Sequence, residues 1–166
     1  MKPTSRAILG YIETAEGIAP ARLRGLPSWL LGQTSLRAQR IGADRFAAVG
    51  SHRSEYAVLC ALDEYGPASQ IALGRRCGFD RSDMVAIVND LAEKHLVERR
   101  PDAADRRRNV ITLTAAGRRH LRKLDAVAEA IQDELLAPLS GRDREQLAKL
   151  LRRVLDSSAP ESPRGD

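Results

Sequence analysis

Apolar residues recur at intervals of three and four along most of the chain, which predicts a mainly α-helical protein. Residues 27–50 form the first clear helical pattern, which Gly50 and Ser51 interrupt. Its candidate core positions are Trp29, Leu30, Leu36, Ile41 and Phe46. A second helix is predicted within residues 52–67, with Tyr56, Leu59 and Leu62 facing inward. Residues 1–25 carry a weak pattern, so a short helix followed by a linker is expected there.

Two shorter helical patterns follow, joined by a tight turn. Ser69 is placed to cap the first of these helices, and Gly78 ends it. Asp80 is placed to cap the second helix, whose apolar stripe consists of Met84, Ile87, Val88 and Leu91. Two helices, a glycine turn and an acidic cap form the outline of a helix-turn-helix, although many helix pairs share this outline.

A predicted β-hairpin makes the helix pair more informative. Two β-prone runs, residues 96–100 and 109–114, flank a charged segment. A helix-turn-helix followed by such a hairpin is a winged helix. Two amphipathic helices close the chain, the first within residues 115–139 and the second after Ser140, which begins an S-x-x-D cap. Their apolar stripes are Leu121, Leu124, Val127, Ile131 and Leu135, and then Leu147, Leu150, Leu151, Val154 and Leu155.

The winged helix is too small to cover both C-terminal stripes. They pack either on the first helix or on a second copy of the chain, and a dimer is the economical solution. The predicted parts are an N-terminal extension, partly helical or flexible (1–25), N-terminal helices for dimerisation and support (26–66), the winged helix-turn-helix with its two-stranded wing (67–114), C-terminal dimerisation helices (115–156) and a disordered tail (157–166).

The positive charge of the chain is concentrated in one segment. The formal net charge is +5, and residues 98–123 alone carry nine Lys or Arg against three acidic residues. Such a cluster permits nucleic-acid binding without proving it, because a basic loop can also be a solvated, mobile one. No apolar run approaches a membrane span and no signal-peptide core is found, so a cytoplasmic protein without membrane contact is expected.

Other kinds of chemistry find little support in the sequence. No nucleophile–base arrangement, P-loop or dinucleotide fingerprint is present, so neither an enzyme nor a cofactor is predicted. The three histidines and two cysteines lack the spacing of metal ligands, and no metal is expected. Cys60 and Cys77 fit buried apolar positions better than redox sensors.

Residues 66–117 resemble the winged-helix core of the MarR family of bacterial transcriptional regulators. The residues that carry the resemblance are Leu91, Leu96-Val97, Arg99-Arg100, Asp102, Asp105-Arg106-Arg107, Leu113-Thr114 and Gly117. The D-x-x-D-R-R before L-T-x-x-G is fairly specific, and the match extends more loosely from about residue 26 to 156. The resemblance implies a homodimer, formed through the first and last helices, that binds double-stranded operator DNA, commonly an inverted repeat.

The resemblance also gives the charged hairpin a role. The family's wing arginine corresponds to Arg107, which would enter the minor groove, and Asp105 would hold it in place. An aspartate two residues from an arginine can orient a guanidinium, and narrow minor grooves attract arginine. Arg106 and Arg108 would meet phosphates. The cysteine in the first helix of the family's peroxide-sensing branch has no counterpart here.

The helix from Arg81 would lie in the major groove. Its candidate DNA contacts are Arg81, Ser82, Asp83, Val85, Ala86 and Asn89, with Ser69 and Gln70 from the preceding helix. Its N-terminus would favour a phosphate, Val85 or Ala86 could touch a thymine methyl, and Asn89 could pair with an adenine edge. Asp83, Ala86 and Asp90 stand where many relatives are basic or rich in Thr and Arg, so much of the affinity is expected from the wing.

A small-molecule effector is a further implication of the resemblance. In the family, small and often aromatic anions bind between the dimerisation helices and the winged helix. Candidate ligand contacts are Trp29, Gln33, Arg37, His52 and Tyr56, although Trp29 and Tyr56 suit the core equally well. The sequence therefore predicts a repressor relieved by an aromatic or phenolic ligand. The alternatives are a regulator without ligand control and a winged helix that binds an acidic protein partner.

Overall fold

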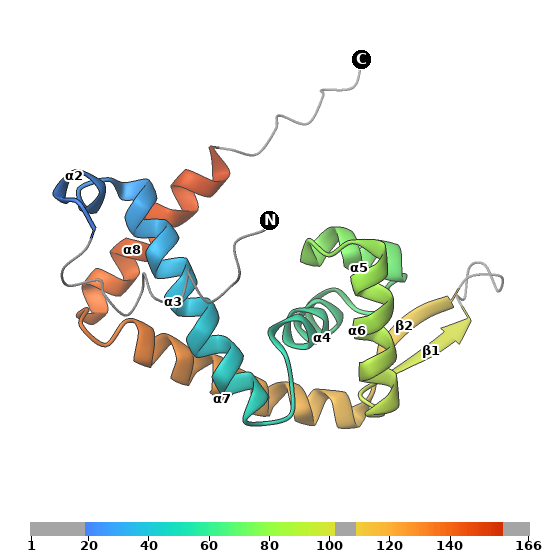
Figure 1. The fold of residues 1–166 in the computed structure, drawn as a ribbon. Coiled ribbons are helices and arrows are strands. Elements are labelled where there is room, and N and C mark those ends of the chain that lie inside the picture. The colour runs from blue at the N-terminus through green and yellow to red at the C-terminus, as the bar shows by residue number, and fades with distance from the viewer. Residues whose placement is uncertain (1–18, 102–108, 158–166) are drawn as a thin grey trace, which may run out of the picture. The chain divides into compact units, whose positions relative to one another are not determined.

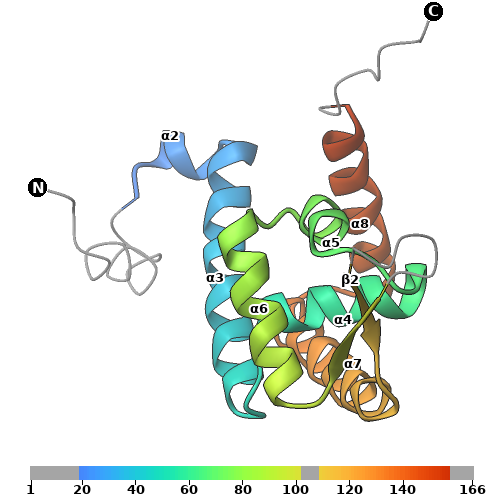
Figure 2. The same ribbon diagram turned by 90° about the vertical axis from the view of Figure 1, so that its right-hand side faces the viewer.

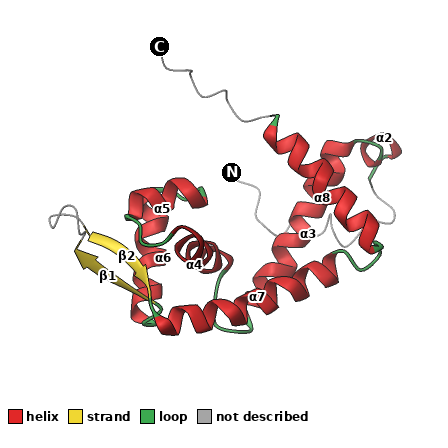
Figure 3. Ribbon diagram, turned by 180° about the vertical axis from the view of Figure 1, so that it is seen from behind, coloured by secondary structure: helices red, strands yellow, loops and turns green. Residues whose placement is uncertain are grey.

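The computed structural model describes residues 19–101 and 109–157 of the 166-residue chain. Helices dominate it, and a single pair of strands is seen in the described part (Figures 1 and 3). The elements are α2 (Ala21–Arg24), α3 (Pro27–Ala47), α4 (Arg53–Tyr65), α5 (Gln70–Cys77), α6 (Arg81–Glu93), β1 (Val97–Pro101), β2 (Asn109–Leu113), α7 (Ala115–Leu135) and α8 (Gly141–Asp156). The predicted mainly α fold with a β-hairpin is confirmed. No helix in the described ranges is long and apolar enough to cross a membrane.

The helix pair α5–α6 has the caps that its sequence predicts. The Ser69 hydroxyl accepts a hydrogen bond from the Ala72 N–H at 3.2 Å and starts α5. Gly78 ends α5 with φ 72°, a left-handed conformation that glycine adopts without a Cβ clash. Asp80 Oδ1 accepts from the Asp83 N–H at 2.8 Å and starts α6. Local side-chain chemistry therefore fixes where both helices begin.

The hairpin β1–β2 lies against this helix pair. Its strands are antiparallel, with Val97 opposite Leu113 and Pro101 opposite Asn109. Ala68, between α4 and α5, forms an isolated bridge with Ile111 on β2. Figures 1 and 2 show the hairpin beside α6, with which β1 is in contact. Residues 102–108, the connection between the strands, lie outside the described residues.

The hydrophobic core gathers where α4, α5, α6, the hairpin and α7 meet, with Phe46 from the end of α3. The predicted stripe of α6 is confirmed, because Met84, Ile87, Val88 and Leu91 are all buried. The α4 residues Leu59 and Leu62 are buried, and Tyr56 is partly buried. On α3 the prediction holds for Phe46, but Leu30 is 47% exposed in the single chain, so its predicted burial is wrong there.

Gly117 marks the closest approach between α7 and the base of the hairpin. A Cβ at this position would lie 2.1 Å from the carbonyl oxygen of Leu96 and 2.6 Å from Leu113 Cδ1. Leu96 is tied to the start of α7, since its carbonyl also accepts from the Thr114 N–H at 3.1 Å. A glycine is therefore needed where α7 begins to pack on the winged helix.

The chain separates into two compact units, Met1–Ile131 and Gln132–Asp166. In the second unit Ser140 caps α8 as predicted, accepting from the Asp143 N–H at 3.3 Å. Arg144 forms an ion pair with Asp133 at 2.7 Å. Along the apolar stripe of α8, Leu147 and Leu151 are half-buried and Leu150, Val154 and Leu155 are exposed.

Candidate nucleic-acid interface

One face of α6 is exposed over about two and a half turns. It carries all six α6 residues predicted to contact DNA, Arg81, Ser82, Asp83, Val85, Ala86 and Asn89. The opposite face is held in the core by Met84, Val88 and Leu91. Side chains four residues apart lie on the same side of a helix, so Arg81, Val85 and Asn89 follow one another along the exposed strip.

The start of α5 lies next to this strip. A hollow of about 650 Å³ is lined by Gln70 from α5, Arg81 and Val85 from α6, and Asn109 from β2, among others. The structure thus brings together candidate residues from separate parts of the sequence. The Ser69 hydroxyl is already used as the cap of α5, whereas Gln70 Nε2 is buried without a hydrogen-bond partner in the described part of the chain.

The N-terminus of α6 is less suited to a phosphate than the sequence suggests. Asp80 accepts hydrogen bonds from the Asp83 N–H and from the Ser82 hydroxyl, both at 2.8 Å, and these bonds lower the pKa of its carboxyl. The charged Asp80 carboxylate therefore already accepts from one N–H group of the first turn. Asp83 adds a second negative charge there. Both charges disfavour a phosphate at this helix end, and the predicted phosphate contact stays a prediction.

Asn89 is engaged by a residue that the sequence does not single out. Its Oδ1 accepts a hydrogen bond from Nη2 of Arg99 on β1 at 2.5 Å. Both side chains are exposed. The neighbouring Arg100 forms an ion pair with Glu98 at 2.6 Å. The wing residues Asp105, Arg106, Arg107 and Arg108 lie outside the described residues, and their predicted contacts remain predictions.

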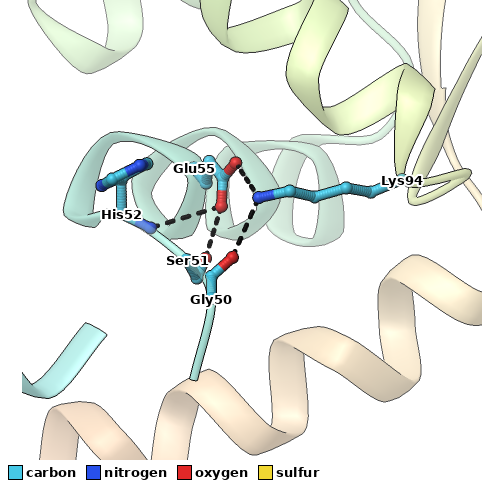
Figure 4. Close-up of polar contacts among 5 residues, drawn as sticks. All are labelled: Gly50, Ser51, His52, Glu55 and Lys94. Carbon is cyan, nitrogen blue, oxygen red and sulfur yellow. Dashed lines mark hydrogen bonds and ion pairs between the residues drawn. The ribbon is translucent and has the colours of Figure 1, made fainter. Parts of the chain in front are cut away.

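A buried polar cluster joins the end of α6 to the start of α4 (Figure 4). Glu55, on α4, is 1% exposed and accepts from the Ser51 hydroxyl at 2.5 Å and from the His52 N–H at 3.3 Å. Lys94, which caps the C-terminus of α6, donates to Glu55 at 2.6 Å and to the Gly50 carbonyl at 3.0 Å. The cluster fixes one end of the exposed helix against the turn between α3 and α4.

The electrostatics of Glu55 favour its charged form. Burial raises the pKa of this carboxyl, but the hydrogen bonds from Lys94 and Ser51 and the charge of Lys94 together outweigh burial, so its pKa lies below the ordinary value. Sequence reasoning missed this cluster. The available signal is that Glu55 shares the buried stripe of α4 with Leu59 and Leu62, where a carboxylate requires a partner.

The five candidate ligand residues fall into two groups in the single chain. Trp29, Gln33 and Arg37 follow one another along one face of α3. Tyr56 packs on Phe46, at 5.5 Å between ring centroids, and Phe46 lies about 25 Å along α3 from Trp29. His52 is the N-cap residue of α4 and is exposed. The chain by itself therefore does not bring all five residues into one pocket.

Tyr56 is held firmly by its surroundings. Its hydroxyl donates to Asp125 Oδ1 on α7 at 3.0 Å, and burial together with this bond raises the pKa of the phenol. Tyr56 also packs against the hydrophobic core. These contacts agree with the core interpretation, which the sequence left open beside the ligand one.

The cysteines have the surroundings of packing residues. Both are half-buried, and Cys77 donates to the Ala57 carbonyl at 3.6 Å. Burial raises the pKa of both thiols, which keeps them protonated and weakly reactive. Within the ranges 19–101 and 109–157, no group of three or more His, Cys, Asp or Glu side chains is placed to hold a metal ion.

The hairpin, the helix pair and the exposed strip of α6 together define a winged helix-turn-helix protein. Residues 50–108 match the family model described as "MarR family". The HTH-type transcriptional repressor NicR of Pseudomonas putida is 32% identical over 103 residues, which are 62% of this chain and 65% of NicR.

Solved structures extend the similarity over most of the fold. A probable transcriptional regulator from Pseudomonas aeruginosa is 32% identical with a TM-score of 0.70, covering 80% of this chain and 98% of that one. BpsR of Bordetella bronchiseptica, whose DNA binding is regulated by 6-hydroxynicotinic acid, is 25% identical with a TM-score of 0.72, covering 86% and 100%. This chain belongs to the MarR family of transcriptional regulators.

Proposed function

We propose that this chain is a homodimeric, sequence-specific DNA-binding repressor that a small aromatic acid releases from its operator. The observation that carries the proposal is the exposed strip of α6, which stands beside the hairpin while the opposite helix face is locked in the core. An exposed helix face of this length fits the major groove of B-DNA. The similarity to NicR, a transcriptional repressor, and to BpsR, whose DNA binding is regulated by a small molecule, supports the same function.

The proposed complex uses two contacts per subunit. Helix α6 lies in the major groove and the wing lies in the flanking minor groove, which Arg107 enters. Val85 is 40% exposed, so its methyl groups are available to a thymine methyl. The cluster of Glu55 and Lys94 holds the far end of α6, so that the helix meets DNA at a fixed angle.

The proposed dimer is argued from the exposed apolar stripe of α8. Leu155 is 71% exposed, which is unfavourable for a leucine in water unless another surface covers it. A second copy of the chain is the proposed cover, because a two-fold dimer presents two α6 helices to the two halves of an inverted repeat. In the proposed dimer the ligand site draws on both subunits, which suits the two separate groups of candidate ligand residues.

The ligand is proposed to be a small aromatic acid of the 6-hydroxynicotinic acid type. It can release DNA only if it binds better to a dimer whose α6 spacing does not match the operator. Trp29 is the single tryptophan of the chain, so its fluorescence reports directly on the proposed site.

The test uses the full-length chain bound to a fluorescent operator duplex. Adding 6-hydroxynicotinic acid is expected to lower the fluorescence anisotropy of the duplex and to change the Trp29 emission over the same concentration range. Cyclohexanecarboxylic acid, which keeps the carboxylate but has no aromatic ring, is the matched control. Unchanged anisotropy and unchanged emission up to millimolar ligand would contradict control by this class of acid.

A further inference from the structure

Two adjacent arginines of β1 lie on opposite faces of the hairpin. Arg99 pairs with Ile111 and Val97 pairs with Leu113, and both partners are buried. Residues directly opposite each other in an antiparallel pair point to the same face, so Arg99 leaves the strand on the core-facing side, where β1 contacts α6. Arg100 lies on the other face and is paired with Glu98 at 2.6 Å.

The position of Arg99 explains its contact with Asn89. Val97 on this face is buried, whereas Arg99, two residues further along β1, is exposed. Its side chain reaches the exposed face of α6 and donates from Nη2 to Asn89 Oδ1 at 2.5 Å. A guanidinium has donors and no acceptor, so only the amide oxygen of Asn89 can face it. The Nδ2 group of Asn89 is therefore turned away from Arg99 with both of its hydrogens.

This arrangement limits what Asn89 can recognise. Reading adenine requires one acceptor for its N6 amino group and one donor for its N7, in a planar pair with the amide. Oδ1 keeps a second lone pair, but its bond to Arg99 holds this oxygen toward β1. The groups that face away from the hairpin are therefore the Asn89 Nδ2 donors, beside the remaining donors of Arg99. Two neighbouring donors match two neighbouring acceptors, which DNA offers at guanine O6 and N7 and at phosphate oxygens.

We propose that Arg99 and Asn89 form a single donor-only contact that binds hydrogen-bond acceptors of operator DNA and disfavours adenine. The inference rests on the proposed DNA-binding function and names the chemistry of one part of its interface. Arg99 has a double role in it, since it positions the Asn89 amide and supplies charge. No carboxylate partner of Arg99 occurs within residues 19–101 and 109–157, whereas Arg100 has one.

The difference between the two arginines supplies a matched control. Arg99→Ala and Arg100→Ala remove the same charge from adjacent positions of one exposed strand, but only the first frees the Asn89 amide. Asn89→Ala removes the amide donors at position 89 without changing charge. All three side chains are exposed, so the core is untouched, and circular dichroism melting of each variant checks that it is folded.

The experiment selects duplexes from a random library with the wild-type chain and with each variant, and then measures binding to the selected operator at several salt concentrations. We expect Asn89→Ala and Arg99→Ala to weaken operator binding by about 10- to 100-fold, and Arg100→Ala to weaken it far less. If the acceptor is guanine, Asn89→Ala and Arg99→Ala both lose the preference for guanine at one position of each half-site. If it is phosphate, base preferences stay and affinity falls uniformly, with a smaller salt slope for Arg99→Ala.

Three results would overturn the proposal. Asn89→Ala could bind the operator as the wild type does, or Arg99→Ala could behave like Arg100→Ala. The wild type could also select adenine at a position whose preference disappears in Asn89→Ala. In each of these cases the wild type still selects an operator, so the proposed function stands. A wild type that selects no sequence overturns the proposed function, and this inference with it.

Discussion

Glu55 is a buried residue that carries a charge. It occupies a core position on α4, yet it is charged, because Lys94, Ser51 and the His52 N–H all donate to its carboxylate. A buried charge is costly unless it is paired and hydrogen-bonded. Removing one partner leaves the other charge buried without compensation. The Lys94 side chain is 38% exposed, so the pair is half solvated and the lysine can return to water.

Glu55→Gln is expected to lower the free energy of unfolding by about 1–3 kcal/mol at pH 7, because it removes the charge while keeping the shape. The pKa of Glu55 is lower in the folded chain than its ordinary value of 4.5, so its stabilisation is present above that value and is lost as pH falls through the folded value. The difference in free energy of unfolding between the wild type and Glu55→Gln should therefore become smaller as the pH falls from about 5 to about 3, as measured by urea unfolding.

The control is Glu129→Gln, which changes an exposed glutamate of α7. It should show a small effect at every pH, since exposed charges contribute little to stability. A gap between wild type and Glu55→Gln that is equally large at both ends of the pH range would contradict the assigned electrostatics.

The contacts of a residue can be predicted from the sequence when its partner lies nearby along the chain. The caps Ser69, Asp80 and Ser140 were predictable, because each contacts an N–H three residues away. Lys94 and Glu55 are 39 residues apart, and their contact depends on how α6 crosses the start of α4. Arg99 reaches Asn89 only because the hairpin folds back beside α6, and neither spacing nor composition contains that information.

At the scale of elements, α7 depends on one residue without a side chain. The start of this helix packs so closely on the hairpin that a Cβ at Gly117 would meet the Leu96 carbonyl oxygen at 2.1 Å. Backbone atoms cannot rotate away as a side chain can, so either α7 or the hairpin would have to shift. The hairpin is part of the proposed DNA contact, and its placement therefore depends on this packing.

Gly117→Ala is expected to destabilise the chain by at least about 2 kcal/mol, despite the roughly 1 kcal/mol by which alanine favours a helix over glycine. The measurement is urea unfolding followed by circular dichroism. Gly141→Ala at the start of α8 is the control, because a Cβ there meets nothing within 4 Å, so unchanged stability or a gain of up to about 1 kcal/mol is expected. Equal stability of Gly117→Ala and the wild type would show that α7 can move away freely.

The types and order of the elements were predictable, because their patterns are long and their turns carry glycine, proline and caps. Burial was less predictable than type. The α6 stripe is buried as expected, but Leu30 on α3 is exposed in the single chain. An apolar stripe says that a helix needs a partner surface, and it does not say whether that surface belongs to the same chain.

At the scale of the whole molecule, the stripe of α8 raises the same question. Leu150 and Leu155 are exposed, whereas covering each would contribute about 1–2 kcal/mol. The proposed dimer covers them and places two copies of α6 for two half-sites.

Replacing both leucines with glutamine, as Leu150→Gln with Leu155→Gln, should raise the dissociation constant of the dimer by more than about tenfold. Size-exclusion chromatography with light scattering over a dilution series measures this. The control is Lys149→Gln with Arg152→Gln, which changes two exposed polar residues of the same helix. A dimer that is equally stable in both double variants would place the interface elsewhere.

The most direct test of the central claim is selection of genomic DNA fragments by the purified full-length chain at about 0.15 M salt, where non-specific phosphate binding is weakened. Sequence-specific binding by a dimer predicts enrichment of a short inverted repeat whose half-sites lie about one helical turn, roughly 34 Å, apart. A partner-binding winged helix also carries a basic hairpin, but it has no reason to prefer one duplex over another. Fragments recovered without any sequence enriched above background would contradict the account.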